Sequence, residues 1–82
     1  MVTVAYDQRL EKAVRMIKDK EVKERVKRHI RKIVNNPHVG KPMRFARKGT
    51  REIYVPPFRL SYVYLQEKDT IVFLDFYHKD KQ

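Results

Sequence analysis

Apolar side chains recur in the first part of the chain with the spacing of two amphipathic helices. In both stripes they follow steps of three and four residues, which place them on one helical face. Asp7 and Asp19 precede the stripes, and each carboxylate can accept hydrogen bonds from the N–H groups of a first turn. Asn35-Asn36-Pro37 ends the second helix, because proline disfavours the helical conformation for the residue before it. The stripes are Leu10, Ala13, Val14 and Ile17, then Val22, Val26, Ile30, Ile33 and Val34.

Four other segments have the composition of β-strands. Short β-branched or alternating runs bounded by turn residues are typical of strands. Pro56-Pro57 and the polar Glu67-Lys68-Asp69 separate the last three segments, and residues 37–50 form an irregular basic loop between the second helix and these strands. The predicted strands are residues 2–6, 51–55, 58–66 and 70–77.

Residues 58–66 show which strand face meets the core. Large apolar side chains there alternate with Arg59, Ser61 and Val63, so the two sets lie on opposite faces. We therefore expect a single α+β domain over residues 1–82, in the order β-α-α-β-β-β. A helical hairpin packs on one face of an antiparallel sheet, and basic and aromatic side chains line the other face.

The charge of the chain is strongly positive. Twenty Lys and Arg residues face 10 Asp and Glu residues, a net charge of +10. Residues 41–60 are the most cationic segment, with six basic residues and one acidic residue. Such a surface predicts an anionic partner, either nucleic acid or an acidic protein. A densely charged, solvated surface of the kind found in thermophiles is the alternative.

Several classes of site are disfavoured. The chain has no cysteine, which excludes disulfides, cysteine nucleophiles and Cys-based metal sites. His29, His38 and His78 do not have the spacing of metal ligands, and no phosphate-binding glycine loop is present. We therefore expect no metal and no cofactor. No signal peptide or membrane-spanning run is recognisable, so a cytoplasmic location is predicted.

Basic and aromatic residues concentrate in the second half of the chain. Basic groups neutralise phosphates, and aromatic faces stack on unpaired bases. Tyr62 and Tyr64 share the alternation of the apolar set in residues 58–66 and are expected in the core. The candidate RNA- or phosphate-binding residues are Lys41, Arg44, Arg47, Lys48, Arg51 and Tyr54.

Arg59 is the sharpest candidate. On an open sheet face its guanidinium is a phosphate clamp, whereas under a covered face it is a costly half-buried charge. In an antiparallel meander, the start of residues 58–66 pairs with the end of residues 70–77, which brings Arg59 near His78 and Lys79. Histidine can move protons near neutral pH. An exposed, functionless position near the chain end is the alternative for His78.

Three motifs in order resemble the RelE/ParE toxin superfamily of toxin–antitoxin modules. Gly40-Lys41-Pro42-Met43-Arg44 is similar to a loop of the family, Phe58-Arg59-Leu60-Ser61-Tyr62 to its arginine-bearing strand, and Tyr77-His78-Lys79-Asp80 to its terminal motif. The resemblance covers nearly the whole chain in element order. It implies a RelE-like fold and, for RelE-like members, metal-independent cutting of messenger RNA on the ribosome by attack of the ribose 2′-OH on the scissile phosphate.

The resemblance also implies residue roles. Arg59 holds the scissile phosphate, Lys79 stands where the family often has a second arginine, and His78 matches a common histidine. Lys48 and Arg51 lie near basic positions of the preceding strand. These roles make Arg59, Lys79 and His78 the candidate catalytic residues.

Two departures from the family keep other functions open. The family's tyrosine near the C-terminus has no match after Asp80, and Lys79 lacks the bidentate fork of arginine. Tyr54 and Tyr77 are possible substitutes for stacking. A toxin homologue that binds RNA or antitoxin without cutting, a ParE-like inhibitor of DNA gyrase, and a simple interaction module remain alternatives to the nuclease. An acidic antitoxin and messenger RNA on the ribosome are the expected partners.

Overall fold

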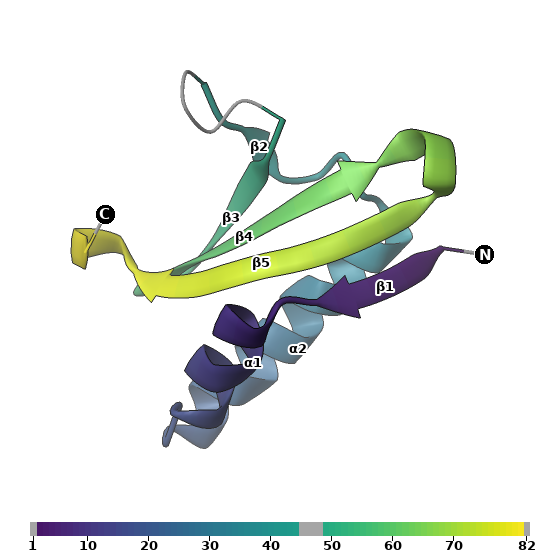
Figure 1. Cartoon of the computed structure of the whole chain (residues 1–82). Coiled ribbons are helices and arrows are strands. Elements are labelled where there is room, and N and C mark those ends of the chain that lie inside the picture. The colour runs from purple at the N-terminus through teal and green to yellow at the C-terminus, as the bar shows by residue number, and fades with distance from the viewer. Residues whose placement is uncertain (1, 45–48, 82) are drawn as a thin grey trace.

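The protein, described here by a computed structural model over residues 2–44 and 49–81, places two helices against one face of a five-stranded sheet (Figure 1). The predicted helical hairpin and the strand-rich second half are both confirmed. The elements are β1 (Thr3–Tyr6), α1 (Gln8–Arg15), α2 (Lys20–Asn35), β2 (Lys41–Pro42), β3 (Arg51–Val55), β4 (Phe58–Leu65) and β5 (Thr70–His78), with short 3-10 turns η2 (Gln66–Lys68) and η3 (Lys79–Lys81).

Both helices begin where the sequence predicts. Asp7 Oδ1 accepts a hydrogen bond of 2.8 Å from the Arg9 N–H, and Asp19 Oδ1 accepts one of 2.8 Å from the Glu21 N–H. These bonds satisfy donors that a first helical turn leaves without an intrahelical partner. α2 ends at Asn35, two residues before Pro37. The two caps fix where each helix of the hairpin begins.

The sheet differs from the expected antiparallel arrangement in two respects. Its strand order is β1-β5-β4-β3-β2, and β1 runs parallel to β5, so the sheet is mixed. A parallel pair needs a long crossover connection, and all the elements between β1 and β5 provide it. In addition, Lys41–Pro42, within the predicted irregular loop, forms a two-residue strand that pairs with β3. β5 has a neighbour on each side, as its continuous apolar run predicts.

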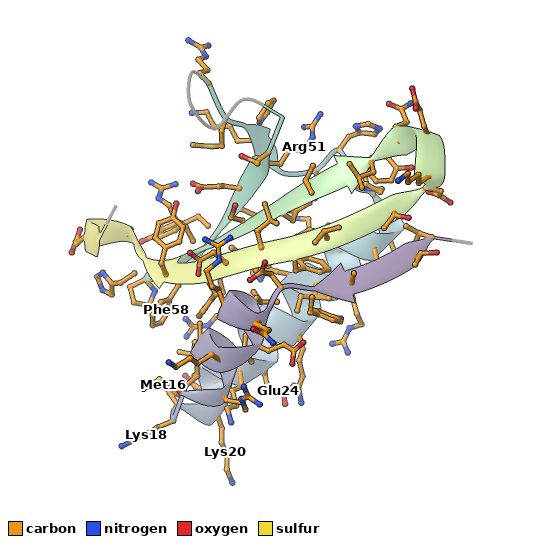
Figure 2. The ribbon with its side chains drawn as sticks, in the orientation of Figure 1. Met16, Lys18, Lys20, Glu24, Arg51 and Phe58 are labelled. Carbon is orange, nitrogen blue, oxygen red and sulfur yellow. The ribbon has the colours of Figure 1, made fainter. Side chains whose placement is uncertain are left out.

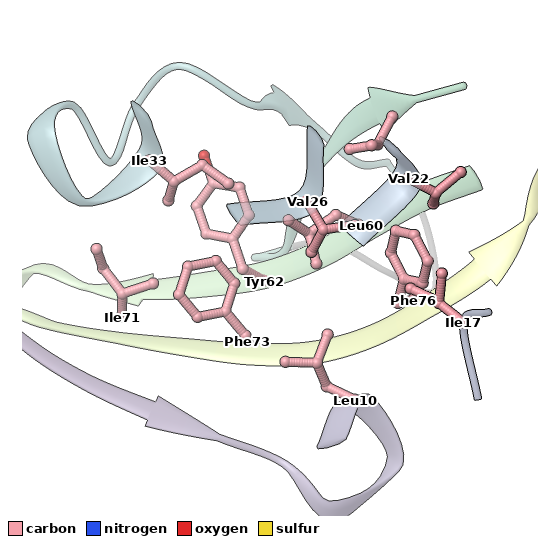
Figure 3. Packing of buried hydrophobic residues seen from close by; sticks show 11 residues of the cluster. Leu10, Ile17, Val22, Val26, Ile33, Leu60, Tyr62, Ile71, Phe73 and Phe76 are labelled. Carbon is pink, nitrogen blue, oxygen red and sulfur yellow. The ribbon is translucent and has the colours of Figure 1, made fainter. Parts of the chain in front are cut away.

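The core lies between the helices and one sheet face (Figure 3). An irregularity between Ser61 and Tyr62 leaves Leu74 of β5 without a partner on β4. This extra residue allows Phe73 and Phe76 to point to the same side, although they are three residues apart. Each fully buried large apolar side chain stabilises the fold by about 1.5–3 kcal/mol. The buried apolar residues are Leu10, Ile17, Val22, Val26, Ile33, Val55, Leu60, Tyr62, Ile71, Phe73 and Phe76.

Neither α1 nor α2 lies over the opposite face of the sheet (Figure 1). On this face of β3 and β4, Tyr54 and Arg59 are exposed to 43 % and 37 %. Within the described residues, no helix is both long enough and apolar enough to cross a membrane.

Candidate functional site on the open face of the sheet

Three strands contribute one row of side chains to the open face. Tyr54 of β3 is paired with Arg59 of β4, which is paired in turn with Tyr77 of β5. Directly opposed residues on neighbouring strands point to the same face. Leu60 and Phe76, which flank this row along their strands, point into the core. Arg59 therefore faces away from the core, and the open sheet face leaves 37 % of its side chain exposed.

Glu52 organises this row from the neighbouring position on β3. It is only 3 % exposed. Tyr77 Oη donates a hydrogen bond to Glu52 Oε2, and Arg59 Nη1 lies 4.0 Å from Glu52 Oε1. One carboxylate thus restrains a guanidinium and a phenol from two other strands.

Sequence reasoning missed Glu52, although a signal was present. It is the one acidic residue among residues 41–60, and it lies two positions from Tyr54, hence on the same strand face. Strands disfavour glutamate. A lone glutamate inside a strand of a cationic segment therefore indicates a specific partner, which proves to be Arg59 with Tyr77.

Tyr54 carries two cations beside its ring. Arg59 Cζ lies 5.7 Å and Lys79 Nζ 5.8 Å from the ring centroid, within the range of cation–π attraction. The Lys79 N–H donates a 3.1 Å hydrogen bond to the carbonyl of Pro57, which ties the end of β5 to the β3–β4 turn. Tyr54 itself is 43 % exposed. The structure thus brings Arg59 and Lys79 together, as the sequence predicts, and places the Tyr54 ring beside both.

His78 lies on the other face of β5. It pairs with Phe58, and the two rings meet edge to face with centroids 5.7 Å apart. Its Nδ1 is 3.7 Å from Asp80 Oδ2 and accepts a 3.2 Å hydrogen bond from the Asp80 N–H. The predicted proximity of His78 to Arg59 therefore holds for the backbone. The side chains diverge, because successive residues of a strand point to opposite faces.

Arg51 is also separate from Arg59, at the far end of the β3–β4 hairpin from Phe58 (Figure 2). Its Nη1 donates hydrogen bonds to the carbonyls of Gly40 at 2.8 Å and His38 at 3.2 Å. It is paired with Tyr62, whose side chain enters the core. These contacts attach the segment between α2 and β2 to the sheet.

Gly40, in the first of the three sequence motifs, lies against Tyr62. The Gly40 N–H donates a 2.9 Å hydrogen bond to Tyr62 Oη, and that hydroxyl donates one of 2.8 Å to the carbonyl of Pro37. A Cβ at position 40 would lie 2.5 Å from Tyr62 Oη, so only glycine allows this approach. Burial raises the pKa of the Tyr62 hydroxyl. Tyr62 is in the core, as predicted, and Tyr64 is partly buried and packs against the core.

The remaining basic candidates are more dispersed than the sequence suggests. Lys41 is exposed and paired with Glu52, which places it on the open face in the row beside Arg59. Arg44 is exposed beyond the end of β2. Arg47 and Lys48 lie outside the described residues. Within the described ranges, no group of three or more His, Asp or Glu side chains could hold a metal ion.

A second, apolar surface lies on the helical side of the molecule. A groove there runs between β1, α1 and α2. Tyr6 at its edge is 46 % exposed and stacks on Phe73, with ring centroids 5.5 Å apart. The lining residues are Tyr6, Leu10, Glu11, Val14, Arg15 and Ile30.

A helical hairpin on a mixed five-stranded sheet is the fold of the RelE-like toxins. The chain belongs to the ParE toxin family of type II toxin–antitoxin systems, whose family model matches residues 2–82. It is therefore the toxin of a toxin–antitoxin module.

Solved structures share this fold at low sequence identity. The RelBE2 toxin–antitoxin complex of Mycobacterium tuberculosis contains a chain that is 24% identical, with a TM-score of 0.83 over 95% of this chain and 98% of that one. A YoeB/ParE toxin from Agrobacterium tumefaciens is 12% identical, with a TM-score of 0.85 over 94% and 98%. The intact RelBE toxin–antitoxin complex of E. coli contains a chain that is 18% identical, with a TM-score of 0.80 over 95% of this chain and 96% of that one. Comparison with curated proteins finds no match.

Proposed function

We propose that this toxin is a metal-independent endoribonuclease that cuts messenger RNA on the ribosome. The observation that carries the proposal is the placement of Arg59. Its guanidinium lies on the open sheet face, restrained by Glu52 and flanked by the cation of Lys79 near the Tyr54 ring. Restrained donors stabilise developing charge because they need little reorganisation during the reaction.

The proposed reaction is an internal transfer at phosphorus. The ribose 2′-oxygen forms a bond to the adjacent phosphorus, and the bond from phosphorus to the 5′-oxygen of the next nucleotide breaks. The products are a 2′,3′-cyclic phosphate and a free 5′-hydroxyl. The pentacoordinate transition state carries extra negative charge on its non-bridging oxygens, and Arg59 and Lys79 would stabilise that charge.

The reaction also needs a proton acceptor for the 2′-OH and a donor for the leaving oxygen. The hydrogen-bonded pair of Tyr77 and Glu52 lies beside Arg59, so we assign proton transfer to this pair. His78 faces Phe58 and Asp80 on the opposite side of β5. We therefore keep His78 as an assisting residue whose loss costs less than the loss of Arg59.

The proposed protein partner is an acidic antitoxin. The charge of +10 would steer an acidic chain toward the toxin and raise its association rate. The groove beside Tyr6 and Val14 has the apolar lining that receives one face of an amphipathic helix. If a neighbouring reading frame encodes a small acidic protein with such a helix, that protein is the molecule to test.

Inhibition of DNA gyrase is the second candidate function. The family model that matches the chain is the ParE model, which favours it. In addition, Glu52 offsets part of the positive charge of Arg59. A supercoiling assay with purified gyrase distinguishes this candidate, because a ribosome-dependent nuclease leaves supercoiling unchanged.

The decisive experiment compares wild type, Arg59→Ala and Arg59→Lys on ribosomes programmed with a defined message, with cut sites located by primer extension. Arg59→Ala should lower cutting by a factor of about 10² to 10³, the usual effect of losing one charge-stabilising donor. Arg59→Lys keeps the charge but cannot donate two parallel hydrogen bonds to a phosphate. Its cutting rate should therefore lie between those of wild type and Arg59→Ala.

Arg31→Ala is the matched control, because it removes an exposed guanidinium from α2 on the helical side. It should cut like wild type. Wild-type cutting by Arg59→Ala contradicts the assigned role. No cutting by the wild type on cognate ribosomes contradicts the nuclease proposal itself.

A further inference from the structure

The two edges of the sheet differ in how they are protected. Natural edge strands are often very short or carry lysine or proline, because unpaired backbone groups otherwise recruit another chain. The β2 edge has all of these features, since Lys41–Pro42 is two residues long and consists of a lysine and a proline. The β1 edge, Thr3–Tyr6, contains neither residue type. It lies at the other end of the strand order, with only β5 beside it (Figure 1).

β1 is also uncharged, which sets it apart from the rest of this chain. Charged residues make up 37% of the sequence, yet none occurs before Asp7. Three of the four residues of β1 are exposed, and Val4 is partly buried against the core. Its β-branched and aromatic side chains favour a strand, and no charge on it would repel a second strand.

The backbone of β1 leaves hydrogen-bonding groups on its outer side. The Asp7 N–H donates a 2.8 Å hydrogen bond to the Phe73 carbonyl, and the Thr3 N–H also bonds toward β5. Backbone groups of successive strand residues point in alternate directions within a sheet. Val4 and Tyr6 alternate with these bonded positions, so their N–H and C=O groups point away from β5.

We infer that the free edge of β1 accepts an extended segment of an acidic protein as an additional strand of the sheet. Such strand addition draws its affinity from main-chain hydrogen bonds. A second copy of this chain is a poorer occupant, because two chains of charge +10 repel each other. An acidic antitoxin fits by charge. The inference therefore rests on the partner in the proposed function and specifies how that partner is held.

The β1 edge is continuous with the apolar groove on the helical side. Tyr6 belongs to both, because its backbone lies on the edge and its side chain lines the groove. An antitoxin helix in the groove, joined to a short extended segment, would reach β1 without leaving the surface. The edge therefore adds a second binding element to the helix, and this element is recognised through main-chain groups.

Amide hydrogen exchange followed by NMR tests the edge directly. The probe is the purified acidic protein of the neighbouring reading frame, bound to the wild-type toxin. In the free toxin, the outward amides of Val4 and Tyr6 should exchange quickly, whereas the Thr3 amide is already hydrogen-bonded. In the complex, exchange at Val4 and Tyr6 should slow by at least about tenfold, because each N–H gains a carbonyl partner.

Val4→Pro provides a second test through affinity. It removes one outward N–H and places the proline ring where a pairing carbonyl would lie. Affinity for the acidic protein should fall by about tenfold, the scale of one lost hydrogen bond. Val4→Ala is the matched control, because it keeps the N–H while losing side-chain contacts with the core. It should bind like the wild type, and thermal melts show whether each variant is folded.

Each outcome decides the inference. Exchange at Val4 and Tyr6 that is as fast in the complex as in the free toxin would overturn it, as would equal binding by folded Val4→Pro and Val4→Ala. In both cases the antitoxin complex itself stands. The exchange measurement uses the wild type and therefore decides the question even when Val4→Pro does not fold.

Two further results bear on the occupant. Absence of any complex with the acidic protein contradicts the inference together with the proposed partner. Dimers of the toxin alone that Val4→Pro abolishes, measured by analytical ultracentrifugation, would assign the edge to a second copy and contradict the acidic occupant. The cutting assay on ribosomes is independent of all these measurements, so the nuclease proposal and the strand-addition inference stand or fall separately.

Discussion

Glu52 and Arg59 lie side by side on the open face of the sheet, with Oε1 and Nη1 4.0 Å apart. The glutamate is nearly buried, whereas the arginine keeps 37 % of its side chain exposed. The strand register directs the guanidinium at the open face, and the carboxylate lies beside it as a counter-charge. The same carboxylate lowers the local positive charge, so under the proposed function we expect an incoming phosphate to need Lys79 as a second cation.

Glu52→Gln should move binding and cutting in opposite directions. The amide removes the negative charge next to Arg59, so affinity for a short, uncleavable single-stranded RNA should rise. Cutting should fall by about a hundredfold, since glutamine cannot take up a proton from Tyr77. Fluorescence anisotropy measures RNA binding and primer extension measures cutting, both on the same preparation. Cutting that stays at the wild-type level would remove Glu52 from proton transfer.

Tyr62→Phe tests the attachment of the segment before β2 to the core. The substitution removes the hydroxyl that accepts from Gly40 and donates to Pro37. Leaving these buried groups without partners should lower the free energy of unfolding by about 1–3 kcal/mol. Gly40→Ala should destabilise by a similar amount, because its Cβ meets the hydroxyl at 2.5 Å.

The double variant of Tyr62→Phe with Gly40→Ala sharpens this test. It removes the oxygen at 2.5 Å from the new Cβ but keeps the ring carbon at 2.7 Å, so its loss of stability should be somewhat smaller than the sum of the two single losses. Urea denaturation gives all four free energies. Simple additivity would show that the two residues do not interact as described.

Arg51→Ala and Lys79→Ala should separate a structural cation from a ligand-binding one. Affinity for RNA should fall steeply with salt, because bound phosphates release counterions. Lys79→Ala should flatten the plot of log affinity against log salt by about one unit and leave stability unchanged. Arg51→Ala should instead lower the melting temperature, because it loses hydrogen bonds to Gly40 and His38. A change of slope without loss of stability in Arg51→Ala would place that residue on the phosphates.

Tyr6→Glu should weaken the complex with the antitoxin. The substitution puts a negative charge at the rim of the apolar groove and opposes both burial and an acidic partner. Affinity for the purified neighbouring gene product, measured by calorimetry, should fall by at least about tenfold. Tyr6→Phe keeps the ring and serves as the control. Equal affinity of Tyr6→Glu and wild type would exclude this groove as the antitoxin site.

Asp7 should contribute pH-dependent stability. The hydrogen bond from the Arg9 N–H holds the pKa of Asp7 below its usual value of 3.8. The charged carboxylate therefore stabilises the fold above pH 3.8, and this contribution disappears as the pH falls through the lowered pKa. Asp7→Asn retains a capping group without the charge. The difference in melting temperature between wild type and Asp7→Asn should shrink on acidification, and a constant difference would contradict the cap's electrostatic role.

Local patterns in the sequence were sufficient for both helices, for every strand except the two-residue β2, and for the direction of Arg59. The caps at Asp7 and Asp19 depend on nearby backbone groups, and the alternation along residues 58–66 assigns Arg59 to the face opposite Leu60. Both depend on contacts or periodicities that span only a few residues.

Only the tertiary structure decided which side chains meet across strands. The register between strands places Glu52 beside Arg59 and Tyr77. It also directs Arg51 toward the carbonyls of Gly40 and His38, away from the open face. The parallel pairing of β1 with β5 depends in the same way on segments far apart in the chain. These relationships depend on long-range pairing and on packing against the helices, which composition and periodicity within a single strand do not encode.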